Sequence, residues 1–330
     1  MHTSPSHAIA LTEYLEPLSP YMADPLNTEI AINEPNRVWT ESREGWKCHD
    51  VDLPFKHCTL LADLIASYNK DSIGENKPVL SGILPTQERV QVVMPPACSQ
   101  GAVSLTIRKF SNLELSLEQL NAQGAFSDVK KARHGLSPIE ETLLNLHNEQ
   151  RYYEFIQLAV KHHLNIIIGG ATGSGKTVLS KGMIQLINPA ERIVTIEDVH
   201  ELFMHNFPNK VHLFYKNKAG SNFTSQDALA SCVRMKPDRI LLSELRGPET
   251  LDYIESLNTG HPGSITSIHA NNAWDVFSRL TSLIKKSEAG MTLDTDFIRS
   301  MCYQTIDVVL FYKNRKLVEV YYEPERKYAA

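Results

Sequence analysis

The sequence lacks the features that mark several classes of protein. Its five cysteines are scattered without a CxxC pair, which argues against a disulfide framework and against a zinc site. No basic, apolar leader opens the chain, so we expect no signal peptide. The longest apolar runs, such as NIIIGG and DVVLFY, are far shorter than the roughly 20 residues that span a bilayer. We therefore expect reduced thiols in a cytosol and a protein that is soluble or, at most, peripheral to a membrane.

Neither sign of charge is in large excess. The 330 residues carry a formal net charge of −5, which argues against a chain that coats nucleic acid along its whole surface, although local basic patches stay possible. The length favours two domains. The hydrophobic fraction of 42% is ordinary for a globular protein with a sizeable core.

The first third of the chain predicts a small antiparallel α+β domain. Short strand patterns occur in TEIAIN, NRVWTES and GWKCHDV, with the turn sequences EPN and SREG between them. A helix pattern follows in HCTLLADLIASYNK, and then RVQVVMPP and AVSLTIRKF alternate like strands. We assign residues 1–110 to this domain. Residues 111–136 have two glycines, mixed charge and no long apolar run, so we expect a linker with a short helix.

From residue 137 onward, helix and strand patterns alternate. The apolar strands NIIIGG, RIVTIED, RILLSE and SITSIHA are separated by helix patterns, and the chain ends in a predicted hairpin that turns at KNRK. One of the helices carries Thr224 and Asp227 at the spacing of a capping box. Continuous apolar strands between helices predict a mostly parallel sheet with both faces covered. We therefore expect an α/β domain over residues 137–330.

The stretch GGATGSGKT contains a Walker A pattern, with a strand pattern before it and a helix pattern after it. Its glycines let backbone N–H groups converge on phosphate, and the helix that follows adds its positive end. We expect Lys176 to bind the β- and γ-phosphates and Thr177 to ligate Mg²⁺. ATP and Mg²⁺ are thus the expected cofactors. The predicted nucleotide-binding residues are Gly170, Ala171, Thr172, Gly173, Ser174, Gly175, Lys176 and Thr177.

Carboxylates stand at the ends of two predicted strands. Glu244 ends RILLSE, and ligands of such sheets bind beyond the C-terminal ends of the strands, so we expect Glu244 to act on the attacking water. Ser243 stands where many strands of this kind carry an Asp that binds Mg²⁺, so a carboxylate from elsewhere is needed. The stretch IEDVHE supplies Glu197, Asp198 and Glu201. The alternative for each acid is a solvated surface group or a helix cap.

Two histidines, His261 and His269, lie in TGHPGSITSIHANN. Metal ligation is one interpretation, but their spacing suits no zinc pattern. The second is a core histidine that makes one hydrogen bond. The third is a sensor that donates a hydrogen bond to the γ-phosphate.

Together, ATGSGKT, IEDVHE, RILLSELRG and TGHPGSITSIHAN resemble the Walker A, Asp, Walker B and His boxes of the secretion NTPases. These are the hexameric traffic ATPases of type II and type IV secretion and of type IV pili. The type IV secretion (conjugation) branch fits best, because EIAINEPNRVWTE, LPTQERVQVVMPPA and VSLTIRKFS resemble its N-terminal domain. The four-cysteine insert that is frequent in the type II branch is missing. The resemblance covers about residues 25–325, and Ser243 and Phe110 depart from the expected Gly or Ala and Pro.

The resemblance implies a RecA-like P-loop NTPase domain at the C-terminus, with nucleotide held between the two domains. It implies that Glu244 is the catalytic glutamate and that Arg108 reaches the γ-phosphate as an arginine finger, from the same subunit or from a neighbour. Arg133 is a weaker candidate for the same role, and Arg234 and Arg246 are expected in subunit contacts or packing. The remaining implied residues are Glu197, Asp198 and Glu201, which support Mg²⁺ and the water, and His261 and His269, which sense the γ-phosphate.

The implied assembly is a homohexamer, peripheral to the cytoplasmic face of the inner membrane. It powers pilus assembly and transfer of DNA or protein with inner-membrane components and other ATPases of the apparatus. One alternative is a type IV pilus or type II secretion motor, and another is a nucleic-acid-dependent RecA-like motor. The latter needs basic and aromatic loops such as VHLFYKNKAGSNF, although an apolar hairpin with solvated lysines explains that stretch equally well. A non-catalytic nucleotide-binding scaffold is a third alternative, against which Glu244 argues, and direct contact with nucleic acid stays open.

Overall fold

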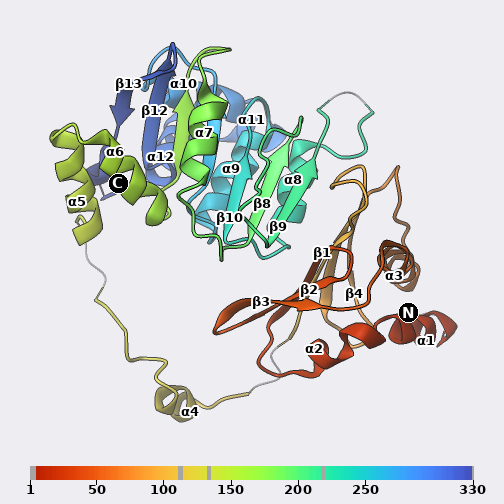
Figure 1. Cartoon of the computed structure of the whole chain (residues 1–330). Helices are drawn as coiled ribbons and strands as arrows, with labels where there is room; N and C mark the ends of the chain where they lie inside the picture. Colours follow the sequence, from red (N-terminus) through yellow and green to blue (C-terminus); the bar gives the residue numbers. More distant parts are fainter. Residues whose placement is uncertain (1–4, 111–113, 132–134, 218–219, 329–330) are drawn as a thin grey trace.

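The computed structural model of the chain describes residues 5–110, 114–131, 135–217 and 220–328. Figure 1 shows two bodies connected by an extended segment that contains the short helix α4 (Leu117–Ala122), as predicted. No helix within the described ranges combines the length and the apolar composition needed to cross a membrane.

The N-terminal body is built on a six-stranded antiparallel sheet with the strand order β3-β2-β1-β6-β5-β4. All the predicted strands of this region are present, and β4, which the patterns did not predict, forms one edge. Its sequence VLSGI contains a glycine, which weakens the strand pattern. The strands are β1 (Glu29–Glu34), β2 (Arg37–Ser42), β3 (Gly45–Asp50), β4 (Val79–Ile83), β5 (Arg89–Val93) and β6 (Ser104–Arg108).

Helices pack on this sheet and close its core. Buried Leu61 and Ile65 lie one helical turn apart on α3 and belong to the same apolar cluster as Ile30 and Leu105 of the sheet. Leu11 of α1 completes the cluster. The helical segments are α1 (Pro5–Tyr14), η1 (Glu16–Leu18), α2 (Ser19–Ala23) and α3 (Phe55–Tyr68).

The C-terminal body contains two parallel sheet segments, β10-β8-β9 and β11-β7-β12, and the second is extended by the antiparallel strand β13. The Ser264 hydroxyl donates to the Ile240 carbonyl at 2.5 Å and the Ser267 hydroxyl to that of Ser243 at 2.9 Å, which places the segments side by side. The strands are β7 (Ile166–Gly169), β8 (Ile193–Glu197), β9 (Lys210–Phe214), β10 (Arg239–Leu242), β11 (Ile265–Ile268), β12 (Val308–Lys313) and β13 (Lys316–Tyr321).

Helices cover both faces of this sheet (Figure 1), so the predicted α/β class is confirmed. The Thr224–Asp227 capping box opens α8 as predicted, and the final hairpin turns at Asn314 and Arg315, which have φ angles of 51° and 60°. The helical segments are α5 (Pro138–Asn148), α6 (Tyr152–Lys161), α7 (Lys176–Ile184), α8 (Ser225–Cys232), α9 (Glu249–Asn258), α10 (Asp275–Ile284), α11 (Glu288–Thr292), α12 (Thr295–Thr305) and η2 (Pro324–Tyr328).

The strand β9 adds a parallel pairing that the sequence did not predict. The stretch VHLFYKNKAGSNF begins within β9, which pairs in parallel with β8 at the edge of the sheet, because the chain reaches β9 from β8 through the loop at residues 198–209. Beyond β9 the chain turns back, and the backbone N–H of Lys216 donates to the Phe223 carbonyl at 3.1 Å.

The two bodies meet at Arg192, which is fully buried immediately before β8. Its guanidinium donates to the Met235 carbonyl of the C-terminal body at 2.9 Å. It also donates to the side chains of Asn33 at 2.9 Å and Thr106 at 3.4 Å in the N-terminal body. Its Cζ atom lies 5.0 Å from the centroid of the Trp46 ring. Burial lowers the pKa of Arg192 to about 10, so the side chain stays charged at neutral pH.

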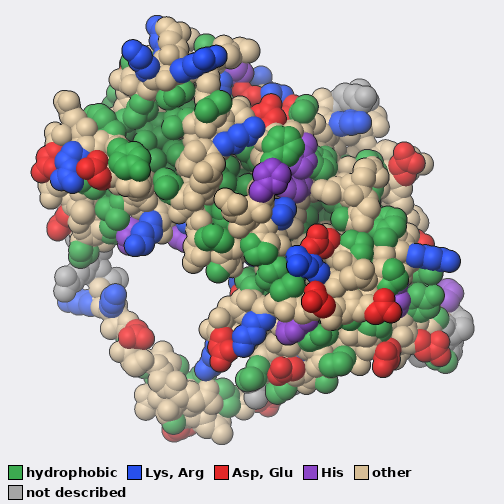
Figure 2. Space-filling view, viewed as in Figure 1, with side chains coloured by type: hydrophobic (Ala, Val, Ile, Leu, Met, Phe, Trp, Pro, Cys, Tyr) green, Lys and Arg blue, Asp and Glu red, His purple; other side chains and the backbone are tan. Residues whose placement is uncertain are grey.

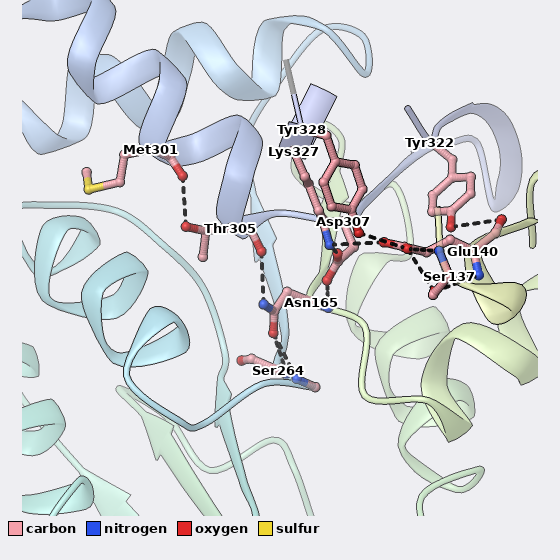
Figure 3. Close-up of polar contacts among 11 residues, drawn as sticks. Ser137, Glu140, Asn165, Ser264, Met301, Thr305, Asp307, Tyr322, Lys327 and Tyr328 are labelled. Carbon is pink, nitrogen blue, oxygen red and sulfur yellow. Dashed lines mark hydrogen bonds and ion pairs between the residues drawn. The ribbon is translucent and has the colours of Figure 1, made fainter. Parts of the chain in front are cut away.

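A second polar network fixes the C-terminus against the sheet (Figure 3). Lys327 of η2 pairs with the buried carboxylate of Asp307 and lies 4.0 Å from Glu140 of α5. Asp307 also accepts the backbone N–H of Asn165 at 2.7 Å. Asn165 stands directly before β7, so this network lies at the end of the strand opposite to the Walker A loop.

Candidate nucleotide site

The Walker A loop connects the end of β7 to the start of α7, as its sequence context predicts. Gly173 and Gly175 have φ angles of 72° and 103°, a region that favours glycine. A Cβ atom at Gly170 would lie 2.4 Å from the Tyr312 carbonyl oxygen and 2.8 Å from the Ser174 hydroxyl. The loop therefore needs glycine at these positions to fold over the sheet edge.

Lys176 is buried at the first position of α7. Its ammonium donates to the carbonyls of Gly170 at 2.9 Å and Ala171 at 3.1 Å. Burial lowers the pKa of Lys176, and the nearby charge of Glu244 opposes this shift. Neutral carbonyls hold the ammonium in place without neutralising it, so the loop is prepared for an anion.

A pocket of about 550 Å³ adjoins the loop. Its wall includes the predicted loop residues from Thr172 to Thr177 and side chains that follow the C-terminal ends of three parallel strands. Those side chains are Asp198 and Glu201 after β8, Ser243, Glu244 and Arg246 after β10, and His269 after β11. The rest of the wall is Val178 of α7, Ser267 of β11, and Tyr312 and Arg315 of the final hairpin. The strand ends and the loop thus converge as the sequence predicted.

Glu244 is hydrogen-bonded through one carboxylate oxygen and lies close to His269 with the other, which is buried without a hydrogen-bond partner among the described residues. Nε2 of His269 lies 2.8 Å from Oε1, and Nε of Arg246 donates to Oε2 at 2.6 Å. Arg246 also pairs with Asp198 through its Nη1 atom. A carboxylate that is fixed in this way can orient a water molecule toward an anion on the loop.

Glu197 does not line this pocket, which corrects the role expected for it beside Mg²⁺. Its carboxylate is fully buried and accepts the backbone N–H groups of Glu201 at 2.7 Å and Leu202 at 2.8 Å. Burial acts to raise the pKa of Glu197, but hydrogen bonds from His212, Thr195 and the backbone outweigh it and lower the pKa. The side chain shapes the loop that carries Asp198 and Glu201.

His261 also lies outside the pocket wall, so the sensor role expected for it is corrected. His261 lies before β11, a strand of 4 residues, and His269 lies directly after it, so the two histidines are at opposite ends of the strand. His269 is at the end that faces the nucleotide loop, and His261 is half-buried at the other end. Of the two candidates, His269 alone reaches Glu244.

Arg108 is not part of the pocket wall within this chain. It ends β6, its side chain is 68% exposed, and its Nε lies 3.6 Å from Oε1 of Glu29. The structure therefore does not place an arginine finger from Arg108 over the loop of the same subunit. Arg133, the weaker candidate, lies outside the described residues.

Comparison with known proteins identifies the family. A family model described as type II/IV secretion system protein matches residues 136–315. The type IV secretion system protein VirB11 of Brucella abortus biovar 1 (strain 9-941) is 41% identical, over 98% of this chain and 92% of the relative. VirB11 of Bartonella quintana (strain Toulouse) is also 41% identical, over 96% of this chain and 94% of the relative.

The chain belongs to the type II/IV secretion system protein family. The crystal structure of the VirB11 ATPase from the Brucella suis type IV secretion system superposes on this secretion ATPase with a TM-score of 0.93 and 40% identity. The match covers 98% of this chain and 97% of that chain. It confirms the predicted fold class and the assignment to the type IV secretion branch, and with them the prediction of a nucleotide-using ATPase.

Three residues of the pocket in this secretion ATPase were missed or misassigned from sequence. Arg246, expected in subunit contacts or packing, pairs with Glu244 inside the pocket instead. The backbone N–H of Arg315 donates to the Ser174 carbonyl at 3.0 Å, and the Tyr312 hydroxyl donates to the Arg315 carbonyl at 2.9 Å. The KNRK turn was visible in the sequence, but its position over the loop depends on β12 lying beside β7.

Proposed function

We propose that this secretion ATPase hydrolyses ATP in the pocket above the Walker A loop, with Glu244 orienting the attacking water. The observation that carries this assignment is the position of the Glu244 carboxylate beside the loop of Lys176, where Oε2 is hydrogen-bonded to Arg246 and Oε1 lies 2.8 Å from His269. Lys176 binds the phosphates, and His269 senses the γ-phosphate through its contact with Glu244. Asp198 and Glu201 support the metal and the water from the neighbouring strand end.

The residues of the pocket suit Mg²⁺ as well as a triphosphate. Thr177, Asp198 and Glu244 offer the oxygen ligands that this cation prefers. The hydroxyls of Ser174 and Ser243 are buried and, among the described residues, have no hydrogen-bond partner, so they have free capacity toward a bound group. Bound Mg²⁺ neutralises charge on the phosphate oxygens.

We infer that the working unit is a homohexamer of two-domain subunits, with residues 1–110 and 137–330 as the domains. In support, the pocket wall comes from residues 172–315 alone, and the exposed side chain of Arg108 is free to reach a neighbouring subunit. The ring acts at the cytoplasmic face of the inner membrane, together with inner-membrane components and other ATPases of the apparatus. It powers pilus assembly and substrate transfer.

The test combines two measurements on the purified chain. Mass in solution is determined with and without Mg-ATP, and phosphate release is followed under the same conditions. We expect six subunits and continuous hydrolysis. A monomer that hydrolyses ATP would contradict the ring, and a ring that releases no phosphate above the level of Lys176→Ala would contradict the assigned pocket.

A further inference from the structure

We propose that Glu197, His200 and His212 form a binding site for a first-row divalent transition metal ion, separate from the nucleotide pocket. One ligand atom from each side chain lies within 4.8 Å of the other two. Glu197 ends β8, His200 belongs to the loop that follows, and His212 lies in β9. Two imidazoles and one carboxylate are a donor set that Zn²⁺ and related ions bind with water in the remaining positions.

His200 offers a buried ring nitrogen that is free to bind an ion. Its Nε2 atom is buried and, within the described part of the chain, has no hydrogen-bond partner. A buried polar nitrogen without a partner costs free energy, so such atoms are rare unless an ion or water contacts them. The rings of His200 and His212 lie with their centroids 4.6 Å apart, which brings a second imidazole to the same place.

The other two side chains are already oriented. Backbone N–H groups hold one oxygen of the fully buried Glu197, and the Thr195 hydroxyl donates to the other oxygen at 2.7 Å. The Thr195 oxygen also lies 2.8 Å from Nδ1 of His212, whose side chain is 8% exposed. Hydrogen bonds of this kind around the ligands fix their orientation and raise metal affinity.

The site lies behind the wall of the nucleotide pocket, not in it. Glu197, His200 and His212 are absent from the residues that line that pocket, whereas Asp198 and Glu201 of the same loop line it. A bound ion would join β8, the loop and β9, and so restrain the segment that carries Asp198 and Glu201. The sequence did not reveal the site, because His212 joins the other two only through the parallel pairing of β9 with β8.

The experiment uses the full chain after treatment with EDTA and dialysis, titrated with Zn²⁺ by calorimetry and with Co²⁺ by visible absorption. We expect one ion per chain. His200→Ala and His212→Ala each remove a ligand, so each should weaken binding by at least the roughly 10–100-fold that is typical of losing an outer-shell partner. His205→Ala is the matched control, because His205 is an exposed histidine of the same loop. His269→Ala removes the imidazole of the nucleotide pocket, and it should bind Zn²⁺ like the unaltered chain.

Thermal unfolding gives a second measurement. Zn²⁺ should raise the Tm of the unaltered chain and leave that of His200→Ala unchanged, because an ion stabilises the state that binds it. His200 is only partly buried, so this variant carries the test even where His212→Ala fails to fold. Absence of stoichiometric binding, unchanged affinity in His200→Ala, or an equal loss in His205→Ala or His269→Ala would overturn the proposal.

Discussion

Arg246 binds the Glu244 carboxylate directly, with its Nε atom 2.6 Å from Oε2. The same guanidinium pairs with Asp198 through Nη1. Glu244 follows β10 and Asp198 follows β8, which are adjacent parallel strands. One arginine therefore fixes the relative position of two acids that stand at separate strand ends. The roles assigned to these pocket residues can be tested by substitution.

Replacing Glu244 with glutamine keeps the shape of the side chain and removes the base. We expect ATP to bind normally and turnover to fall by about 10²–10⁴-fold, the usual contribution of a positioned general base. Nucleotide affinity and steady-state phosphate release, measured on the same preparation, check this. Near-normal turnover would move the role to Asp198 or Glu201.

Replacing Arg246 with alanine should remove the bridge that holds Glu244 and Asp198 in place. Hydrogen bonds to charged groups contribute about 1.5–3 kcal/mol, so we expect kcat to fall roughly 10–100-fold with little change in nucleotide affinity. Arg246→Lys should restore part of the loss. The control is Arg299→Ala, which removes an exposed arginine of α12 paired with Asp296. A kcat for Arg246→Ala equal to that of the control would show that Arg246 does not position Glu244.

Arg108 is expected to act between subunits, since it does not line the pocket of its own chain. Arg108→Ala should bind ATP nearly normally and hydrolyse it about 10³–10⁵-fold more slowly, the known range for arginine fingers. Mixing Arg108→Ala subunits with Lys176→Ala subunits, each inactive alone, should restore activity, because some sites then contain both groups. A mixture that stays inactive would exclude action between subunits.

Glu29 should make the stability of the chain depend on pH. Burial raises the pKa of Glu29 to about 7, and Arg108 opposes the shift. The folded chain then holds a proton that the unfolded chain releases above pH 4.5, so the stability from Glu29 is complete below that pH and is lost as pH rises through about 7. Glu29→Gln removes this titration. We therefore expect its effect on the free energy of unfolding to be about 1–3 kcal/mol more favourable at pH 8 than at pH 4.5.

Denaturant unfolding of the two proteins at both pH values measures this difference. Glu34→Gln is the control on the same strand, since the Glu34 side chain is 53% exposed and pairs with Arg37. Equal effects of Glu29→Gln at pH 4.5 and pH 8 would contradict the shifted titration.

The local parts of the site were predictable, and the parts that depend on tertiary pairing were not. The Walker A loop follows from a short pattern with a strand before it and a helix after it, and Glu244 follows from its place at the end of an apolar strand. Glu197 and Asp198 are neighbours, and successive side chains of a strand point to opposite sides, so only the fold decides which of them reaches the pocket. His261 was misassigned for a similar reason, because the direction of β11 separates it from His269.

The fold, like the site, was predictable where local patterns determine it and not where distant strands pair. The antiparallel N-terminal sheet and the α/β alternation follow from periodicity, whereas β4 has a weak pattern and β9 could be recognised as a parallel strand only from its partner β8. Arg315 reaches the loop through the pairing of β12 with β7, two strands that are more than 130 residues apart in the chain. Interactions at that separation leave no local pattern.

The strand β8 connects Arg192, at the contact between the two bodies, to the nucleotide pocket. The strand has 5 residues, about 17 Å of rigid backbone, and it is hydrogen-bonded on both sides by β10 and β9. At one end stands Arg192, bonded to the N-terminal sheet, and at the other stands Asp198 in the nucleotide pocket. One strand of the central sheet therefore connects the nucleotide pocket directly to the contact between the two bodies.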